Sequence, residues 1–344
     1  MGVTLPQAPP TMIDLIPLKL VLTLASPYLA GHSGEEAIEI AHRLHREHDY
    51  ASTLDILGED AATDEDCEAA VAHYQHLVDA IKAHPLECEN RRQQLTISMK
   101  PSMFSTMAPQ HGAESDKAQE AAFDRITRVV DYALKNEINV TLEAEDHRWT
   151  NFQLESYFAL INAGYANLGT VLQSRLFRTE KDITRFDGRM RVRLVIGIYN
   201  EPAQIAHTDK RIMKDLLVKY GSNLLARGVY TELASHDTRC IETFYKKVVM
   251  PQNVPASQFE HQFLQGVPRT KLQNGLVTGN YFREAEHGFA ESAHLEKLKE
   301  TGALVRMYLP FGTAKVSGAY CKRRLRENPN MITYGVKNLL GLQS

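Results

Sequence analysis

Eight short runs of apolar or alternating residues recur along the chain at the length of a β-strand, and segments with helical spacing separate them. The runs cover residues 52–57, 95–99, 140–143, 168–172, 192–196, 230–234, 258–264 and 303–309. Regular alternation of strand and helix predicts a parallel sheet, and eight such units close most naturally into a barrel. A doubly wound sheet usually has fewer strands and often carries a G-x-G-x-x-G turn, which this sequence lacks. We therefore predict an α/β fold of the (β/α)₈ TIM-barrel type.

The helical segments carry recognisable starts and apolar faces. After Thr63, which opens a capping pattern with Asp66, apolar residues recur from Val71 to Ile81 at helical spacing. Helical patterns also fill residues 1–50, ahead of the first strand, and we interpret this part as an added N-terminal arm. We assign residues 51–330 to one barrel domain and residues 331–344 to a C-terminal tail or final helix.

Composition excludes several other classes of protein. The chain has 344 residues, and a barrel typically needs about 250 plus extensions. A formal net charge of −3 gives no basic field, which argues against nucleic-acid binding. Four cysteines without a C-x-x-C pair argue against a disulfide framework or structural zinc and favour a cytoplasmic setting. Charged residues and prolines interrupt the apolar stretch 12–30 well short of a membrane span.

Polar residues gather where the predicted strands end. In a barrel of parallel strands these ends meet at one mouth, which carries the active site in this fold. The candidates there are Lys100, Glu143, Glu145, Asp146, Gln173, Arg193, Tyr199, Ser235, His236, Gln262 and Tyr308. Structural interpretations remain open for single residues: His236 as a hydrogen-bonded structural histidine, and Lys100 as a lysine that reaches solvent.

The last helical segment presents an unusual polar face. Tyr320, Arg323, Arg324 and Glu327 fall at positions i, i+3, i+4 and i+7, and therefore share one side of a helix. Two adjacent guanidiniums suit a carboxylate or a phosphate, and Glu327 is spaced to orient either of them. A solvated surface helix with i,i+4 pairs is the alternative, and the spacing alone does not decide between the two.

The acidic segment from Glu143 to His147 raises the question of a divalent metal, since carboxylates and a histidine at a strand end can hold one. No His-x-His or His-Glu-x-x-His spacing supports a metal site. Lysine and arginine side chains around the same mouth would compete for these carboxylates. We therefore favour ion pairing and assign no metal.

The closing segments resemble the signature of the proline dehydrogenase family. Val305-Arg-Met-Tyr-Leu-Pro-Phe-Gly312, followed by Tyr320-Cys-Lys-Arg-Arg-Leu-Arg-Glu-Asn328, has the family's spacing from the tyrosine of strand eight to the arginine pair. Further pieces follow in family order: TLDILGE at 53–59, Ile97-Ser-Met-Lys100, Leu142-Glu-Ala-Glu145, Leu172-Gln173, Arg193-Leu-Val-Ile-Gly-Ile-Tyr199, Ala234-Ser-His-Asp237 and Phe259-Glu-His-Gln262. The resemblance covers about residues 50 to 330.

The resemblance implies a distorted (β/α)₈ barrel that holds FAD, oxidises proline to Δ¹-pyrroline-5-carboxylate and passes electrons to a quinone or another acceptor. The family's substrate-binding positions match Lys100, Tyr308, Tyr320, Arg323 and Arg324. Its catalytic positions match Glu143 and Arg193, with Arg193 beside the flavin N5. Its cofactor-binding positions match Ala144, Gln173, Arg193, Ile196, Gly197, Ile198, Ser235, His236 and Gln262.

Several departures from the family pattern bear on the substrate. Glu143 stands where most members have aspartate, and Pro101 replaces the leucine after the lysine of strand two. The usual R-L-V-K-G-A-Y has Ile196 and Ile198 in place of its lysine and alanine, and Ser174-Arg175 replaces A-Y. The lost lysine removes a positive charge near the flavin.

Three alternatives remain open. The chain could oxidise a related cyclic imino acid, bind flavin or a ligand without turnover, or act as a metal-dependent hydrolase through the segment from Glu143 to His147. We expect a cytoplasmic protein and leave a peripheral contact with the inner membrane open. The sequence does not fix the oligomeric state.

Overall fold

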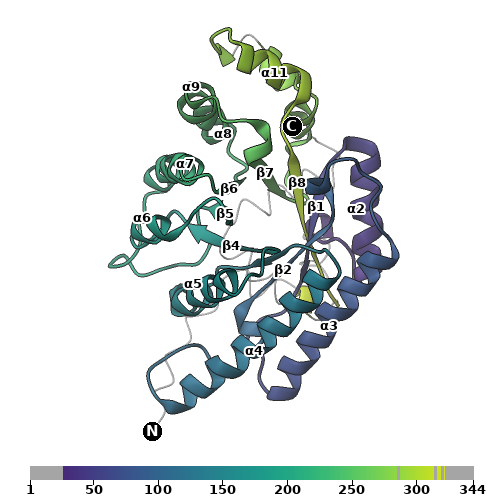
Figure 1. The fold of residues 1–344 in the computed structure, drawn as a ribbon, viewed down its shortest axis with the longest axis vertical. Coiled ribbons are helices and arrows are strands. Elements are labelled where there is room, and N and C mark those ends of the chain that lie inside the picture. Colours follow the sequence, from purple (N-terminus) through teal and green to yellow (C-terminus); the bar gives the residue numbers. More distant parts are fainter. Residues whose placement is uncertain (1–25, 285–286, 314–315, 319–320, 322–344) are drawn as a thin grey trace.

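Eight parallel strands close into one barrel in the computed structural model (Figure 1). The structure describes residues 26–284, 287–313, 316–318 and 321. The strands are β1 (Ala51–Ile56), β2 (Thr96–Met99), β3 (Val140–Leu142), β4 (Leu168–Gln173), β5 (Arg191–Val195), β6 (Tyr230–Ala234), β7 (Phe259–Leu264) and β8 (Val305–Phe311). Each pairs with the next in sequence, and β8 pairs with β1. Every predicted run overlaps one of these strands, so the (β/α)₈ fold is confirmed.

Helices cover the outside of the barrel (Figure 1). The longer ones are α2 (Gly34–His48), α3 (Asp64–Ala83), α4 (Ala113–Lys135), α5 (His147–Asn162), α7 (Lys210–Ala226), α10 (Thr270–Val277) and α11 (Ala293–Thr301). The shorter ones are α6 (Thr179–Asp182), α8 (Thr238–Phe244) and α9 (Met250–Gln252). Single turns are η2 (Ser26–Tyr28), η3 (Arg91–Gln93), η4 (Pro101–Met103), η5 (Ile183–Arg185), η6 (Tyr245–Val249), η7 (Ala256–Gln258) and η8 (Asn280–Arg283).

The start of α3 follows the predicted capping chemistry. The Thr63 side chain accepts a hydrogen bond from the Asp66 N–H, and the Asp66 carboxylate accepts one from the Thr63 N–H. This reciprocal pair satisfies donors that the first helical turn leaves open. Among the described helices, none combines the length and the apolar character that a membrane span requires.

The N-terminal segment is packed against the barrel from Ser26 onward. Helix α2 lies along the wall beside β1 and β8 (Figure 1). Ahead of it, the Ala30 N–H donates to the Pro310 carbonyl at the end of β8 (2.7 Å). Gly266, after β7, has a φ of 78°, and a Cβ there would lie only 2.4 Å from the Pro27 carbonyl oxygen. From Ser26 onward, the predicted arm therefore packs against the outside of the barrel and against the carboxyl ends of β7 and β8. Residues 1–25 and the predicted tail 331–344 lie outside the described residues.

The barrel interior is charged. Arg193 of β5 donates to the Ser98 hydroxyl of β2 (3.3 Å), and Arg306 of β8 donates to the Gln94 carbonyl just before β2 (3.2 Å). Contacts between strands that are not neighbours must cross the barrel, so these side chains point inward. Four carboxylates and four cations are largely buried there: Asp55, Glu143, Glu232 and Glu260, with Lys100, Arg191, Arg193 and Arg306. Their formal charges cancel.

Each interior carboxylate binds one of these cations. Asp55 binds Lys100 (2.6 Å), Glu232 binds Arg191 (2.5 Å), and Glu260 binds Arg306 (2.7 Å). The fourth pair is Glu143 with Arg193. Buried ions of this kind are stable only where opposite charges and further hydrogen bonds replace water.

Gln262 joins three of the four pairs into one network. Its side-chain nitrogen donates to Glu232 (2.6 Å) and Glu260 (2.7 Å), and its oxygen accepts from Arg193 (2.5 Å). Tyr230 also donates to Glu260 (2.9 Å). The network runs from β8 through β7 and β6 to β5, so the side chains of one strand constrain those of the others.

The network predicts that Glu260→Ala is strongly destabilising. The change leaves the Arg306 guanidinium buried without its carboxylate, and losing one partner of a buried pair costs about 3–5 kcal/mol. Urea unfolding of the purified variant measures this loss. As a control, Asp131→Ala removes the partner of the exposed Lys135 and should leave the unfolding midpoint nearly unchanged. Equal midpoints for the two variants would contradict a structural role for the interior charges.

Candidate active site

The structure brings the predicted mouth residues together at one edge of the barrel. All eight strands run parallel, so their carboxyl ends lie on the same face. At or directly after these ends lie Lys100, Glu143, Ala144, Gln173, Ile196, Gly197, Ile198, Ser235 and His236. Within the strands, two or three residues before the ends of β5, β7 and β8, lie Arg193, Gln262 and Tyr308. Tyr320, Arg323 and Arg324 lie outside the described residues.

Asp55 organises one side of this mouth. Its two oxygens accept from the Lys100 ammonium at 2.6 and 2.8 Å, and it also accepts from Tyr308. Burial raises the pKa of Asp55, against the lowering effect of the Lys100 charge. Lys100 is only 4% exposed, so it does not reach solvent. Asp55 therefore sets the positions of two predicted substrate-binding side chains.

Asp55 was absent from the residues predicted for the site. The sequence signal that could have identified Asp55 is its carboxylate, the only charged group in the run 52–57. A buried strand tolerates a carboxylate only where the carboxylate has a partner.

Arg193 occupies the centre of the mouth. It forms an ion pair with Glu143, donates to Gln262, and lies over the ring of Tyr308, 5.1 Å from its centroid. Burial alone would lower the pKa of Arg193, but the charges of Glu143 and Glu232 raise it. Arg193 is thus a buried side chain that stays positively charged, and its contacts with Glu143, Gln262 and the Tyr308 ring fix its position.

Gly197, at the end of β5, is in close contact with the side chains of Gln173 and Arg175. Its φ is 97°, a conformation that favours glycine, and a Cβ there would lie 2.5 Å from the Gln173 side-chain oxygen. The Gln173 side chain is held in turn, because its nitrogen donates to the Glu145 carbonyl (2.9 Å). A side chain at 197 would therefore displace Gln173 or Arg175, so the glycine allows both side chains to lie close to the backbone at the end of β5.

His236, after β6, carries an unused hydrogen-bond donor. Burial, helped by the charge of Arg269, lowers the pKa of His236 to about 4, so the ring is neutral at pH 7. Its Nε2 accepts from the Leu264 N–H (3.3 Å), which places the ring proton on Nδ1. That Nδ1 is buried and has no hydrogen-bond partner among the described residues. An acceptor on a bound ligand would satisfy it.

These features fit a flavin. Oxygen acceptors on the cofactor need donors such as His236 Nδ1, which is buried and has no hydrogen-bond partner among the described residues. The buried Arg193 supplies a fixed positive charge where a ring that gains electrons would need it.

The acidic segment after β3 is engaged by other protein groups. Glu143 binds Arg193, Asp146 binds Arg148, and His147 Nδ1 lies 2.6 Å from the Glu201 carboxylate. Glu145 accepts from Ser102. No group of three metal-binding side chains comes together within the described part of the chain.

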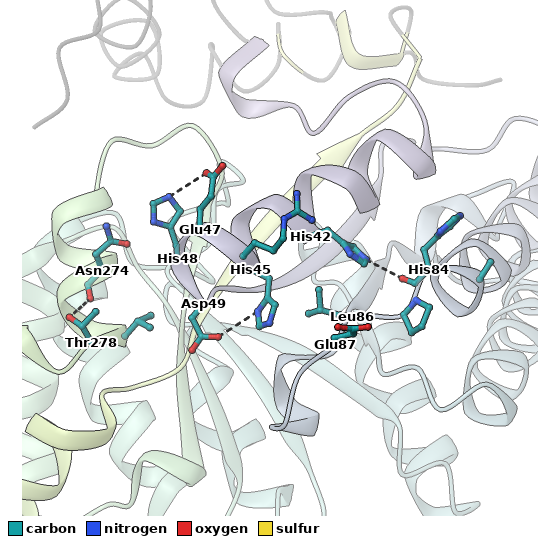
Figure 2. A pocket seen from close by; sticks show the side chains of 14 residues that line it. His42, His45, Glu47, His48, Asp49, His84, Leu86, Glu87, Asn274 and Thr278 are labelled. Atoms are coloured by element: carbon teal, nitrogen blue, oxygen red, sulfur yellow. Dashed lines mark hydrogen bonds and ion pairs between the residues drawn. The ribbon is translucent and has the colours of Figure 1, made fainter.

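A wide cleft of about 1150 Å³ lies at the opposite end of the barrel. Figure 2 shows its lining side chains His42, His45 and His48 of α2 and, next to His42, His84, which follows α3. His42 contacts the His84 carbonyl, and His45 faces Asp49. The cleft lies beside the amino ends of β1 and β2, whereas barrel enzymes carry their chemistry at the carboxyl ends. It is therefore separate from the candidate active site.

The buried Glu145 predicts a pH effect on stability. Burial raises its pKa to about 7, so between about pH 4.5 and 7 the folded chain holds a proton that the unfolded chain has lost. Stability from this group therefore falls as pH rises through that window, by up to about 3 kcal/mol. Urea unfolding from pH 5 to 8 should show wild type losing stability relative to Glu145→Gln. A pH-independent difference between the two proteins would contradict the burial of an ionisable carboxyl group.

Comparison with known proteins agrees with this geometry. The family model described as proline dehydrogenase matches residues 37–333. "Proline dehydrogenase 1" of Bacillus subtilis subsp. natto is 29% identical over 320 residues, which are 92% of this chain and 90% of the relative. "Proline dehydrogenase" of Deinococcus radiodurans is 28% identical over 319 residues, with the same coverage of each chain.

Solved structures share the fold. Proline utilization A from Bdellovibrio bacteriovorus superposes with a TM-score of 0.72 at 19% identity, over 90% of this chain and 33% of that chain. The protein of the same name from Bradyrhizobium japonicum gives 0.69 at 20% identity, over 89% and 31%. This chain thus spans about a third of those longer proteins. Because the family model covers most of its length, the chain belongs to the proline dehydrogenase family.

Proposed function

We propose that this chain oxidises L-proline to Δ¹-pyrroline-5-carboxylate, with FAD bound at the carboxyl ends of the barrel strands. The family match over residues 37–333 gives the reaction, and the family generally uses FAD. The observation that carries the assignment to this site is the buried Arg193, held by Glu143 and Gln262 at the barrel end where the buried His236 Nδ1 has no hydrogen-bond partner among the described residues. FAD, when bound, supplies the acceptor at N5 for the hydride that leaves the ring carbon next to the proline nitrogen.

The proposed roles divide the mouth into two sides. Lys100, Tyr308, Tyr320, Arg323 and Arg324 bind the substrate. Ala144, Gln173, Ile196, Gly197, Ile198, Ser235, His236 and Gln262 hold the cofactor. Glu143 and Arg193 lie between the two sets, and Arg193 favours negative charge on the cofactor ring. Holding both reactants in a fixed orientation is the main catalytic contribution of such a site.

Charge balance explains why an arginine pair is needed. The substrate carries a carboxylate, but the Lys100 ammonium is already paired with Asp55. Glu143 and Arg193 also compensate each other. A net positive charge for the carboxylate must therefore come from further cations. Arg323 and Arg324 supply it in this proposal, and their planar forks suit bidentate binding.

The electron acceptor is a quinone or a similar carrier, reached in the cytoplasm or through a peripheral contact with the inner membrane. A related cyclic imino acid is the second candidate substrate, because Glu143 is one methylene longer than the usual aspartate and contacts Arg193 directly.

Anaerobic titration tests the function. Purified protein should be yellow, and its absorbance near 450 nm should bleach on addition of L-proline. Bleaching by another cyclic imino acid but not by proline would select the second candidate. A yellow protein that no imino acid bleaches would indicate ligand binding without turnover, and a colourless protein with bound divalent metal would point to the hydrolase alternative.

The arginine pair is tested by substitution. Arg323→Ala and Arg324→Ala should each raise the KM for proline steeply, because each removes a charge-assisted contact to the carboxylate worth roughly 2 kcal/mol or more. The FAD content of both variants should match wild type, since neither side chain is assigned to the cofactor. Steady-state kinetics with an artificial acceptor measures the change. A wild-type KM in both variants would refute the assignment.

A further inference from the structure

Ser102 is a buried hydrogen-bonding centre beside the mouth. Its N–H and its hydroxyl donate to the Glu145 carboxylate at 2.9 and 2.6 Å. Its hydroxyl oxygen accepts from the Asp60 N–H (3.2 Å), and its carbonyl accepts from the Ala61 N–H (3.0 Å). Ser102 is 0% exposed and Glu145 is 5% exposed. One serine therefore connects the segments that follow β1, β2 and β3.

This centre lies two residues from Lys100. Ser102 is in the turn η4, which begins directly after Lys100 and closes with a bond from the Met103 N–H to the Lys100 carbonyl (3.1 Å). Pro101 fixes one backbone dihedral of the turn. The backbone of Lys100 is thus rigidly joined to Ser102, and any force that holds Ser102 also holds Lys100.

Glu145 is the group that holds Ser102 from the β3 side. Its carboxylate accepts twice from Ser102, whereas the Lys100 ammonium is bound by Asp55. Its backbone carbonyl accepts from Gln173, which extends the connection to β4. A carboxylate buried in this way lowers stability unless its bonds compensate, so its position favours a role beyond simple packing.

We propose that Glu145 is a positioning residue, which fixes Lys100 through Ser102 and thereby sets the affinity of the mouth for the substrate carboxylate. The inference rests on the proposed function, because it takes Lys100 to contact the substrate. Glu145 itself touches neither substrate nor cofactor in this account. Its removal shifts Lys100 relative to the site and leaves Arg193 and its partners in place.

The kinetic test uses Glu145→Ala, Ser102→Ala and the double variant. Glu145→Ala should raise the KM for proline about tenfold or more, because displacement of a contact group by about 1 Å is costly. Its kcat should stay within about threefold of wild type. Since Glu145 acts through Ser102, the double variant should be no worse than Glu145→Ala. Glu145→Gln, which keeps an acceptor oxygen for Ser102, should recover most of the affinity.

Asn167→Ala is the matched control. Asn167 is also buried and also connects separate segments, since its side-chain nitrogen donates to the carbonyls of Val130 in α4 and of Ile138 just before β3. It lies just before β4, at the end of the barrel away from Lys100. Asn167→Ala should lower stability and leave the KM unchanged. The proposal would be overturned if Glu145→Ala folded and kept the wild-type KM. It would also be overturned if the effects of Glu145→Ala and Ser102→Ala on the KM multiplied in the double variant.

Amide hydrogen exchange gives a readout that does not depend on turnover. Exchange at Ala61 and Ser102 should be faster in Glu145→Ala than in wild type and unaffected in Asn167→Ala. Unchanged exchange at both amides would overturn the positioning role even in an active enzyme. A wild type that fails to oxidise proline would instead contradict the proposed function. If Glu145→Ala does not fold, the KM for proline and the amide exchange are measured in Ser102→Ala instead. A KM and exchange rates equal to those of wild type in that variant would refute the proposal.

Discussion

The ion pair between Arg193 and Glu143, with the interior network beneath it, is the interaction on which the mouth depends. Arg193 also binds Gln262 and reaches Ser98, so one guanidinium connects β5 with β2, β3 and β7. Gln262 extends the network to Glu232 and Glu260. A barrel interior filled with aliphatic side chains would be easier to stabilise. The charged interior instead delivers a cation of fixed position to the catalytic face.

Balance of charge inside the barrel also shapes the substrate preference. Each of the four interior cations has its carboxylate, so these four pairs add no net charge at the mouth. Positive charge for a substrate carboxylate must therefore come from cations outside these four pairs. In the proposed function the arginine face predicted at 320–327 supplies this charge, and Lys100 acts more through the direction of its contact than through net charge.

The sequence predicted the barrel well because alternation of strand and helix is a local pattern that repeats eight times. It also predicted which residues meet at the mouth, since parallel strands bring their carboxyl ends to one face. It did not predict the pairing of Asp55 with Lys100 or the Glu145–Ser102 connection. Those contacts join strands and loops far apart in the chain, and they depend on strand register and loop conformation, which no local pattern encodes. Tyr320, Arg323 and Arg324 lie beyond the described residues, so their roles remain predictions.

The most direct measurement is the reduction potential of the bound FAD in two variants, Glu143→Gln and Arg193→Met/Glu143→Gln. The double variant removes both charges of the pair, so its interior keeps the overall balance. If Arg193 stabilises negative charge on the cofactor as proposed, the double variant should have a more negative potential than Glu143→Gln alone. Equal potentials in the two variants would show that Arg193 does not act on the cofactor, and would contradict the assignment of this mouth as the redox site.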